Sequence, residues 1–164
     1  METRGMRQPL QLLKCWVSNL FFMATTITFQ SEEIKFVLKE KTKHKNWLIK
    51  IASKEKYSIL ELNYIFCSDE YLHKVNLDYL NHDTYTDIIT FDNSEDKKAK
   101  MIEGDIFISI ERVKENAGKF KTELDDELHR VMSHGLLHLM GFKDKTAKDS
   151  AIMRKKEEES ISLF

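Results

Sequence analysis

The stretch His134-Gly-Leu-Leu-His138, followed by Gly141 and Asp144, decides how the rest of this sequence is interpreted. Two histidines four residues apart lie on the same face of a helix, one turn from each other. Gly141 can end that helix in a left-handed turn, and the returning chain can then aim the Asp144 carboxylate at the two rings. Two imidazole nitrogens and one carboxylate oxygen are a three-ligand set for a catalytic zinc ion, which keeps a fourth position for water. The pattern therefore predicts that His134, His138 and Asp144 bind one Zn²⁺ per chain.

Histidines at this spacing also occur by chance on helices, so the glycine turn and the aspartate carry the metal hypothesis. Position 135 then restricts the chemistry. In zinc proteases of the HExxH type, the residue after the first histidine is a glutamate that acts as the general base. This sequence has Gly135 there, so the proton acceptor for peptide hydrolysis is missing. We therefore expect a metal-dependent hydrolase, with a metalloprotease kept as an alternative that a casein-cleavage assay tests.

Length and composition predict one soluble globular domain. The chain has 164 residues, of which 41% are hydrophobic and 32% are charged, enough for a core of its own. The net charge of −1 gives no indication of partners. Residues 31–56 contain eight Lys and four Glu, which fits a solvated helix face better than an RNA-binding surface. Cys15 and Cys67 are too few for a disulfide framework, so a cytoplasmic location is expected.

The first 22 residues differ in pattern from the rest of the chain. An apolar run from Cys15 to Met23 is interrupted by Ser18 and Asn19, has no signal-cleavage site after it and is too short to span a bilayer. We expect residues 1–22 to be an N-terminal extension that is disordered, or that results from a mispredicted start upstream of Met23. Residues 23–164 are expected to form a single metal-hydrolase domain without a membrane segment.

Strand-like and helix-like stretches alternate along this domain. Strands are expected at residues 25–29, 58–67, 86–91 and 106–110, with Gly104 ahead of the last one indicating a close backbone approach. Helices are expected after caps at Ser31 and Ser68, at residues 111–120, from a Thr122-x-x-Asp125 capping box through the histidine pair, and from beyond Asp144 to about residue 160. This order predicts an α+β fold, in which a small mixed β-sheet of about four strands carries packed helices and the metal site lies on a central helix.

Three motifs of the chain resemble those of the YbeY endoribonuclease family. Residues 134–144 resemble the family signature His-Gly-x-Leu-His-Leu-x-Gly-Tyr/Phe-Asp-His. Residues 86–91 (Thr-Asp-Ile-Ile-Thr-Phe) are similar to its Thr-Asp/Asn-Val-Leu-Ser-Phe strand, and residues 104–109 (Gly-Asp-Ile-Phe-Ile-Ser) to its Gly-Asp-Ile-x-Ile-Ser strand. Asn76 and Tyr79 fall where the family has Asn and Tyr before the first of these strands. The motifs occur in the right order over roughly residues 23–160.

The resemblance implies a bacterial, cytoplasmic, zinc-dependent endoribonuclease that is specific for single-stranded RNA. It also implies a role in ribosomal RNA maturation, including the 3′ end of 16S RNA, and in ribosome quality control. The implied partners are ribosomal RNA, the small ribosomal subunit and its assembly factors.

Two positions depart from the family pattern. Asp144 stands where the family has its third histidine, and Lys143 stands where it has an aspartate. Aspartate is an ordinary zinc ligand, although its charge should make a bound water less acidic and favour harder metals. The second departure is Leu80, where the family commonly has an arginine suited to phosphate contact. This loss keeps open a non-enzymatic ribosome-assembly factor with a structural metal as a second alternative.

Further site residues are suggested by position in the motifs. Asp87 and Asp105 lie in the two motif strands and are candidates to orient water or hold a histidine ring from outside the metal's ligand set. Loop capping and pairing with backbone amides are equally good explanations of both aspartates. Glu127 lies seven residues before His134 on the same helix face, and the sequence does not show whether it reaches the metal.

Aromatic residues near the motifs are candidates to stack on unpaired bases. Tyr85 and Phe142 lie closest to the motifs, and core packing is the better explanation for Phe142. His129 is one residue off the line of the histidine pair, so we do not expect it to be a ligand.

Overall fold

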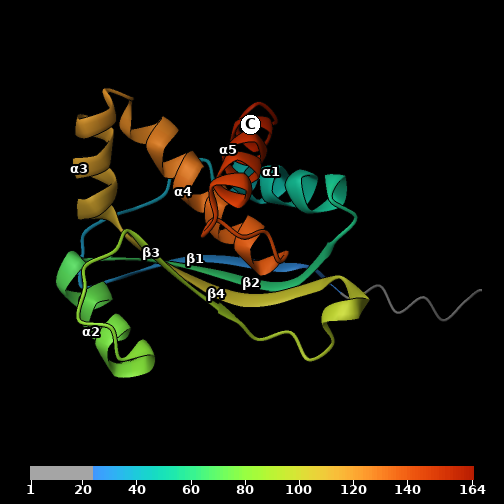
Figure 1. Cartoon of the computed structure of the whole chain (residues 1–164), viewed down its shortest axis with the longest axis horizontal. Coiled ribbons are helices and arrows are strands. Elements are labelled where there is room, and N and C mark those ends of the chain that lie inside the picture. Colours follow the sequence, from blue (N-terminus) through green and yellow to red (C-terminus); the bar gives the residue numbers. More distant parts are fainter. Residues whose placement is uncertain (1–23) are drawn as a thin grey trace, which may run out of the picture.

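The computed structural model describes residues 24–164, so the predictions for residues 1–22 concern a segment outside the described residues. One β-sheet forms the middle layer, with α2 on one face and the other helices on the opposite face (Figure 1). In chain order the elements are β1 (Thr26–Glu32), α1 (Lys41–Lys54), β2 (Ser58–Cys67), α2 (Asp69–Leu80), β3 (Ile88–Asp92), a 3₁₀ turn (Lys97–Ala99), β4 (Met101–Ser109), α3 (Ile110–Phe120), α4 (Leu124–Leu139) and α5 (Ala147–Ile161).

The sheet has four strands in the order β1-β2-β4-β3. β1 pairs with β2 and β2 with β4 in parallel, whereas β3 pairs with β4 in the antiparallel direction. Helical crossovers join the parallel pairs, as parallel strands require. The predicted α+β class, the mixed four-stranded sheet and the order of strands and helices are therefore confirmed.

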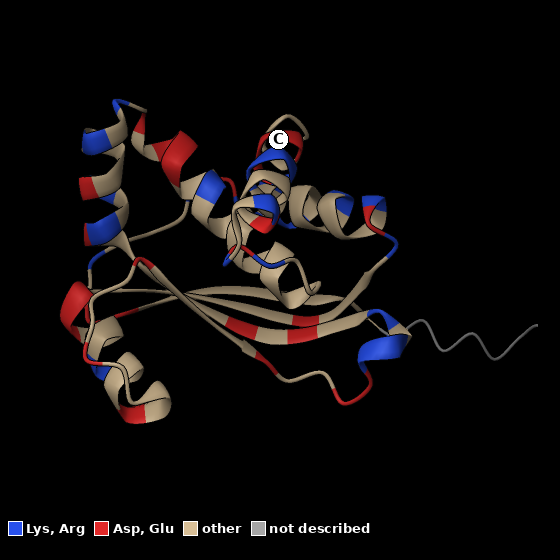
Figure 2. Ribbon diagram, viewed as in Figure 1, with Lys and Arg blue, Asp and Glu red and all other residues tan. Residues whose placement is uncertain are grey.

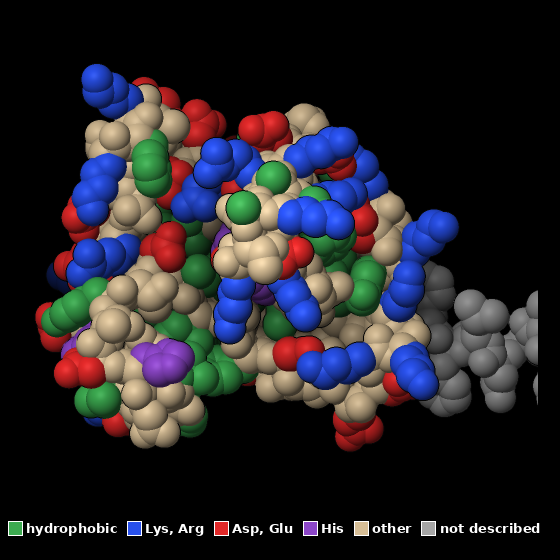
Figure 3. Space-filling model, viewed as in Figure 1, with side chains coloured by type: hydrophobic (Ala, Val, Ile, Leu, Met, Phe, Trp, Pro, Cys, Tyr) green, Lys and Arg blue, Asp and Glu red, His purple; other side chains and the backbone are tan. Residues whose placement is uncertain are grey.

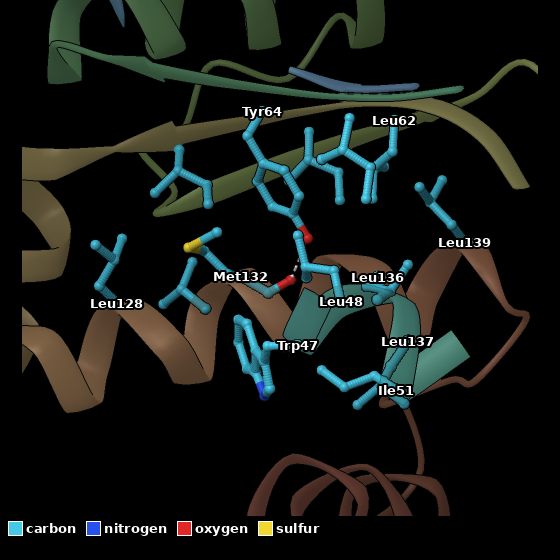
Figure 4. Packing of buried hydrophobic residues seen from close by; sticks show 14 of the residues in the cluster. Trp47, Leu48, Ile51, Leu62, Tyr64, Leu128, Met132, Leu136, Leu137 and Leu139 are labelled. Atoms are coloured by element: carbon cyan, nitrogen blue, oxygen red, sulfur yellow. Dashed lines mark hydrogen bonds between the residues drawn. The ribbon is translucent and has the colours of Figure 1, made fainter. Parts of the chain in front are cut away.

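The main core lies between the sheet and α4, whose sheet-facing residues Leu128, Met132 and Leu136 are buried. Figure 4 shows Tyr64 of β2 pointing from the sheet toward this helix. Its hydroxyl donates a hydrogen bond of 2.9 Å to the backbone carbonyl of Met132. Complete burial raises the pKa of Tyr64 well above its usual value, because the phenolate would lose its hydration. The bond therefore ties a neutral phenol of the sheet to the middle of α4.

Two glycines allow the close contact between α4 and the sheet. A Cβ atom at Gly135 would lie 2.7 Å from Cδ1 of Ile88 and 2.9 Å from Cγ2 of Ile106. A Cβ atom at Gly104 would lie 2.7 Å from the carbonyl oxygen of Phe91 and 2.9 Å from Cδ1 of Leu139. The close approach predicted at Gly104 is present, but in the interior of β4 and not ahead of it, because the strand begins at Met101.

The helix predicted from Ser31 is wrong. β1 continues through this residue to Glu32, which is paired with Cys67 of β2. The Ser31 hydroxyl donates to the carbonyl of Phe36 and closes a turn in place of capping a helix. The helix that carries Trp47 begins only at Lys41. At Ser31, pairing of β1 with β2 thus outweighs the preference of serine for the start of a helix.

Two smaller expectations also need correction. The capping box at Thr122 is absent, because the residue before α4 is Glu123 and it makes no side-chain cap. Three acidic residues in the first turn of α4, seen at its start in Figure 2, instead favour the positive end of the helix dipole. The strand expected from Thr86 begins at Ile88. Within residues 24–164, no helix has both the length and the apolar character needed to cross a bilayer.

Helix α5 is fixed against the body of the domain by polar contacts. The Trp47 indole of α1 donates a 2.7 Å hydrogen bond to the carbonyl of Ser160. Lys156 Nζ lies 2.6 Å from Glu55 Oε1, just beyond the end of α1. Both contacts join residues more than 100 positions apart. They set the position from which α5 contributes to the site described below.

A second pair of histidines is buried between α1 and α4. His44 Nδ1 lies 3.2 Å from the carbonyl of Glu40 and therefore carries a proton. His44 Nε2 then accepts a hydrogen bond of 3.1 Å from Nε2–H of His129. Burial lowers the pKa of both histidines, since the charged forms would lose hydration. Folding therefore favours the neutral pair.

We predict that replacing Gly135 by Ala lowers the free energy of unfolding by about 1–3 kcal/mol, because the added methyl group overpacks the contact with Ile88 and Ile106. The matched control is Gly118→Ala in α3, where an added Cβ meets no atom within 4 Å. That change should stabilise the protein by roughly 0.5–1 kcal/mol through helix propensity. Urea unfolding of both variants measures the two values, and a neutral Gly135→Ala would contradict the packing argument.

The neutral pair predicts a pH dependence of stability. Because the folded pKa values of His44 and His129 are lowered, their contribution is fully present above pH 6.5 and is lost as the pH falls toward the lowered values. The unfolding free energy of the wild type should therefore decrease more steeply below pH 6.5 than that of a His44→Gln/His129→Gln variant. Urea titrations between pH 5 and pH 8 test this, and parallel curves would refute it.

Candidate metal centre

Two histidines of α4 and an aspartate beyond it bring three ligand atoms together. His134 Nε2 lies 2.9 Å from His138 Nε2. Asp144 Oδ2 lies 3.7 Å from His134 Nε2 and 3.4 Å from His138 Nε2. In a tetrahedral site with bonds of 2.0–2.1 Å, zinc ligand atoms lie about 3.3 Å apart. The three separations lie on either side of this value, so the three atoms are close enough together to contact one ion of this size.

The turn after α4 returns the chain to the two histidines. Gly141 has φ +90°, a conformation that L side chains rarely adopt. Its N–H donates to the carbonyl of His138, and the N–H of Phe142 donates to the carbonyl of Leu137. These bonds satisfy the free carbonyls at the end of the helix. The left-handed turn expected at Gly141 is present, and Asp144 lies beside the histidines because of it.

Hydrogen bonds to the other ring nitrogens fix the orientation of both histidines. His134 Nδ1 lies 2.6 Å from Oε1 of Glu157 in α5. His138 Nδ1 lies 2.9 Å from the carbonyl oxygen of Phe142. Both oxygens are acceptors, so each Nδ1 carries the proton and each Nε2 presents a lone pair. With both Nδ1 atoms protonated, the two Nε2 atoms at 2.9 Å and the neighbouring carboxylate make a candidate site for a cation.

An arginine surrounded by carboxylates supports this arrangement from within α4. Arg130 donates to Glu127 through Nε at 2.9 Å and through Nη2 at 2.7 Å. It also lies 3.6 Å from Glu157 and 3.6 Å from Asp87. The bond to Glu127 raises the pKa of Arg130 above its already high value, so the guanidinium is permanently charged. Both carboxylate oxygens of the buried Glu127 thus accept hydrogen bonds from Arg130. Glu127 does not belong to the group of three candidate ligands.

The two aspartates suggested by the motif strands lie in different environments. Asp87 joins the carboxylates around Arg130 and also accepts a bond of 3.3 Å from Asn116. Asp105 faces the opposite side of the sheet from α4, because it alternates with Ile106, which packs under Gly135. Its carboxylate accepts bonds from Asn63 and Asn93 and lines a separate hollow. Strand alternation therefore turns Asp105 away from the histidines, and its carboxylate is bonded to Asn63 and Asn93.

A cavity of about 570 Å³ opens beside the three ligand atoms and lies between α4, α5 and the end of α3. Its lining includes His134, Asp144, Arg130 and Glu157, together with Phe120 and Arg154. Figure 3 shows basic side chains around a recessed histidine on this face of the molecule. The volume lies in the range of ligand-binding sites.

No motif of the sequence pointed to four residues of this lining, which are Arg130, Glu157, Phe120 and Arg154. Glu157 lies 23 positions after the histidine that it contacts, and no spacing rule links the two. A partial signal existed for Arg130, since it lies one turn before His134 on the same helix.

Two aromatic residues named from the sequence lie outside this cavity. Tyr85 stacks on His73 at 4.3 Å and donates a hydrogen bond to Glu70. Phe142 is partly buried and packs against the core, which was the preferred prediction for this residue. His129 belongs to the buried pair with His44 and is not a ligand here. Leu80, at the end of α2, is 41% exposed.

The chain is similar to known proteins along most of its length. The family model described as Endoribonuclease YbeY matches residues 26–164. Endoribonuclease YbeY of Cytophaga hutchinsonii is 61% identical over 138 residues, which are 84% of this chain and 95% of that protein. The protein of the same name from Christiangramia forsetii is 54% identical over 138 residues, with 84% of this chain and 94% of that protein covered.

The fold is similar to that of a solved structure. The solution structure of a Thermotoga maritima protein matches with a TM-score of 0.58 and 26% sequence identity, over 84% of this chain and 87% of that one. Together, the family match and the identity over most of both chains leave one assignment. The chain belongs to the Endoribonuclease YbeY family.

Proposed function

We propose that this protein cleaves single-stranded ribosomal RNA with a zinc ion held by His134, His138 and Asp144. Membership of the family makes the chain an endoribonuclease, and ribosomal RNA maturation is the role of that family. The observation that supports the zinc proposal is that the Nε2 atoms of His134 and His138 and one carboxylate oxygen of Asp144 lie within 3.7 Å of one another. Imidazole and carboxylate together suit zinc, and the exposure of Asp144 leaves the centre accessible.

The chain's own residues hold this centre ready for the reaction. Glu157 fixes the tautomer and the ring orientation of His134. The carbonyl of Phe142 does the same for His138 without adding charge. Arg130 neutralises part of the negative charge of Glu157. A zinc ion bound there supplies Lewis-acid chemistry, since it acidifies a water and polarises a phosphoryl oxygen.

The structure also gives a reason to disfavour peptide hydrolysis. Gly135 faces Ile88 and Ile106 of the sheet, where even one added carbon lies within 3 Å of both side chains. A glutamate at this position would point into the core and away from the histidines. The partners that we propose are accordingly RNA and the small ribosomal subunit with its assembly factors. The 3′ end of 16S RNA is the proposed cleavage region, and the cytoplasm is the proposed location.

We expect His134→Ala and Asp144→Ala each to lower the rate of zinc-dependent RNA cleavage at least about 100-fold, because each removes a ligand from the set of three. A fluorescent single-stranded RNA covering the 3′ end of 16S RNA serves as the substrate. The matched control is His82→Ala, in the exposed loop after α2, which should cleave like the wild type. If wild type and variants were equally inactive while metal removal only unfolded the protein, the proposal would fail. Zinc-dependent casein cleavage would favour the protease.

Glu157→Gln should weaken zinc binding roughly 10- to 100-fold, because the amide keeps the shape of the carboxylate but removes the negative charge that lies 2.6 Å from Nδ1 of His134. The control is Glu158→Gln at the next residue of α5, an exposed glutamate that makes no hydrogen bond or ion pair with a histidine of residues 24–164. Competition with a chromophoric chelator gives both affinities. Equal affinities in the two variants would show that Glu157 does not act on the metal centre.

A further inference from the structure

The cavity beside the three ligand atoms contains two arginines in different electrostatic situations. Arg130 has carboxylates on several sides, so its charge is already balanced. Arg154 projects from α5, is exposed, and forms no ion pair with any carboxylate of residues 24–164. Glu158, one turn further along α5, lines the same cavity and is likewise unpaired within the described part of the chain. Arg154 is thus the lining arginine whose charge is available to a ligand.

An exposed aromatic ring lies at the lining of the same cavity. Phe120 is the last residue of α3 and is 63% exposed. This exposure is unusual, because phenylalanine side chains are among those most often buried in proteins. Its neighbour Lys121 adopts a left-handed conformation that ends the helix and leads into α4. The ring therefore lies on a turn fixed at both ends by helices. An exposed aromatic face on a fixed support is a stacking surface for a nucleobase.

From these two observations, we propose that the cavity is a nucleotide subsite for a single RNA strand. In this subsite Arg154 contacts the phosphate of a nucleotide next to the cleaved bond, and Phe120 stacks on its base. Guanidinium groups match the oxygen geometry of a phosphate. A base can reach Phe120 only if it is unpaired, so the subsite selects single strands. The inference rests on the proposed function, since His134 and Asp144 share the cavity with both residues.

Binding of a labelled single-stranded DNA tests the subsite separately from cleavage, since it presents the same phosphates and bases. Fluorescence anisotropy over a series of salt concentrations measures both affinity and its salt dependence. Arg154→Ala should weaken binding and reduce the slope of log K against log salt by about 0.7, the value for one lost phosphate contact with a single strand. Arg154→Lys should retain the slope, because it retains the charge.

Phe120→Ala should weaken binding roughly 5- to 150-fold, the range for loss of one stacked base, with an unchanged salt slope. Two matched controls remove a basic and an aromatic side chain that do not line the cavity. They are Lys155→Ala on α5 and Tyr79→Ala on α2, which lies on the other face of the sheet and where the Tyr79 residue is 71% exposed. Both should bind like the wild type. In RNA cleavage, Arg154→Ala and Phe120→Ala should raise KM more than they lower kcat.

Wild-type affinity in both Arg154→Ala and Phe120→Ala, or equal losses in the controls, would overturn the subsite. A loss in only one of the two variants would overturn the role of the other residue. These results are distinguishable from failure of the proposed function, in which the wild type itself would bind zinc and DNA but leave RNA uncleaved.

Discussion

The contact of Gly135 with Ile88 and Ile106 determines how deeply α4 lies on the sheet, and the position of the candidate metal centre follows from that depth. A side chain at Gly135 would push the helix outward, and the two flanking histidines would move with it. The Tyr64 hydroxyl fixes the same helix from the sheet side. Backbone proximity thus places His134 and His138 at the margin of the core, where they are partly exposed between the buried residues of α4.

The centre depends equally on charges that the fold brings together from separate elements. Glu157 comes from α5, and Asp87 precedes β3, yet both lie close to Arg130 of α4. Carboxylates taken out of water require a partner, and one guanidinium with several donors serves more than one of them. The contact between Trp47 and Ser160 keeps α5 in place. A structural contact far from the histidines therefore supports the hydrogen bond that orients one of them.

The cavity combines this centre with two features of different chemistry. A balanced arginine, Arg130, holds the protein's own carboxylates, while Arg154 presents its charge to solvent. Phe120 adds an apolar ring on the same lining. This division separates the groups that organise the site from those that we propose to contact the substrate. The proposed subsite draws on α3 and α5, whereas the candidate ligands belong to α4 and the turn that follows it.

Periodicity and short spacing in the amino-acid sequence were enough to predict the four-stranded mixed sheet, the order of elements, the helix with two aligned histidines, and the turn that aims Asp144 at them. These features depend on residues close together in the chain, where backbone geometry leaves few choices. Three features emerge only from the folded chain: Ser31 extends a strand, Asp105 faces away from the histidines, and Glu157 reaches His134. Ladder pairing, strand alternation and helix packing are long-range interactions, and no local pattern specifies which distant side chains they bring into contact.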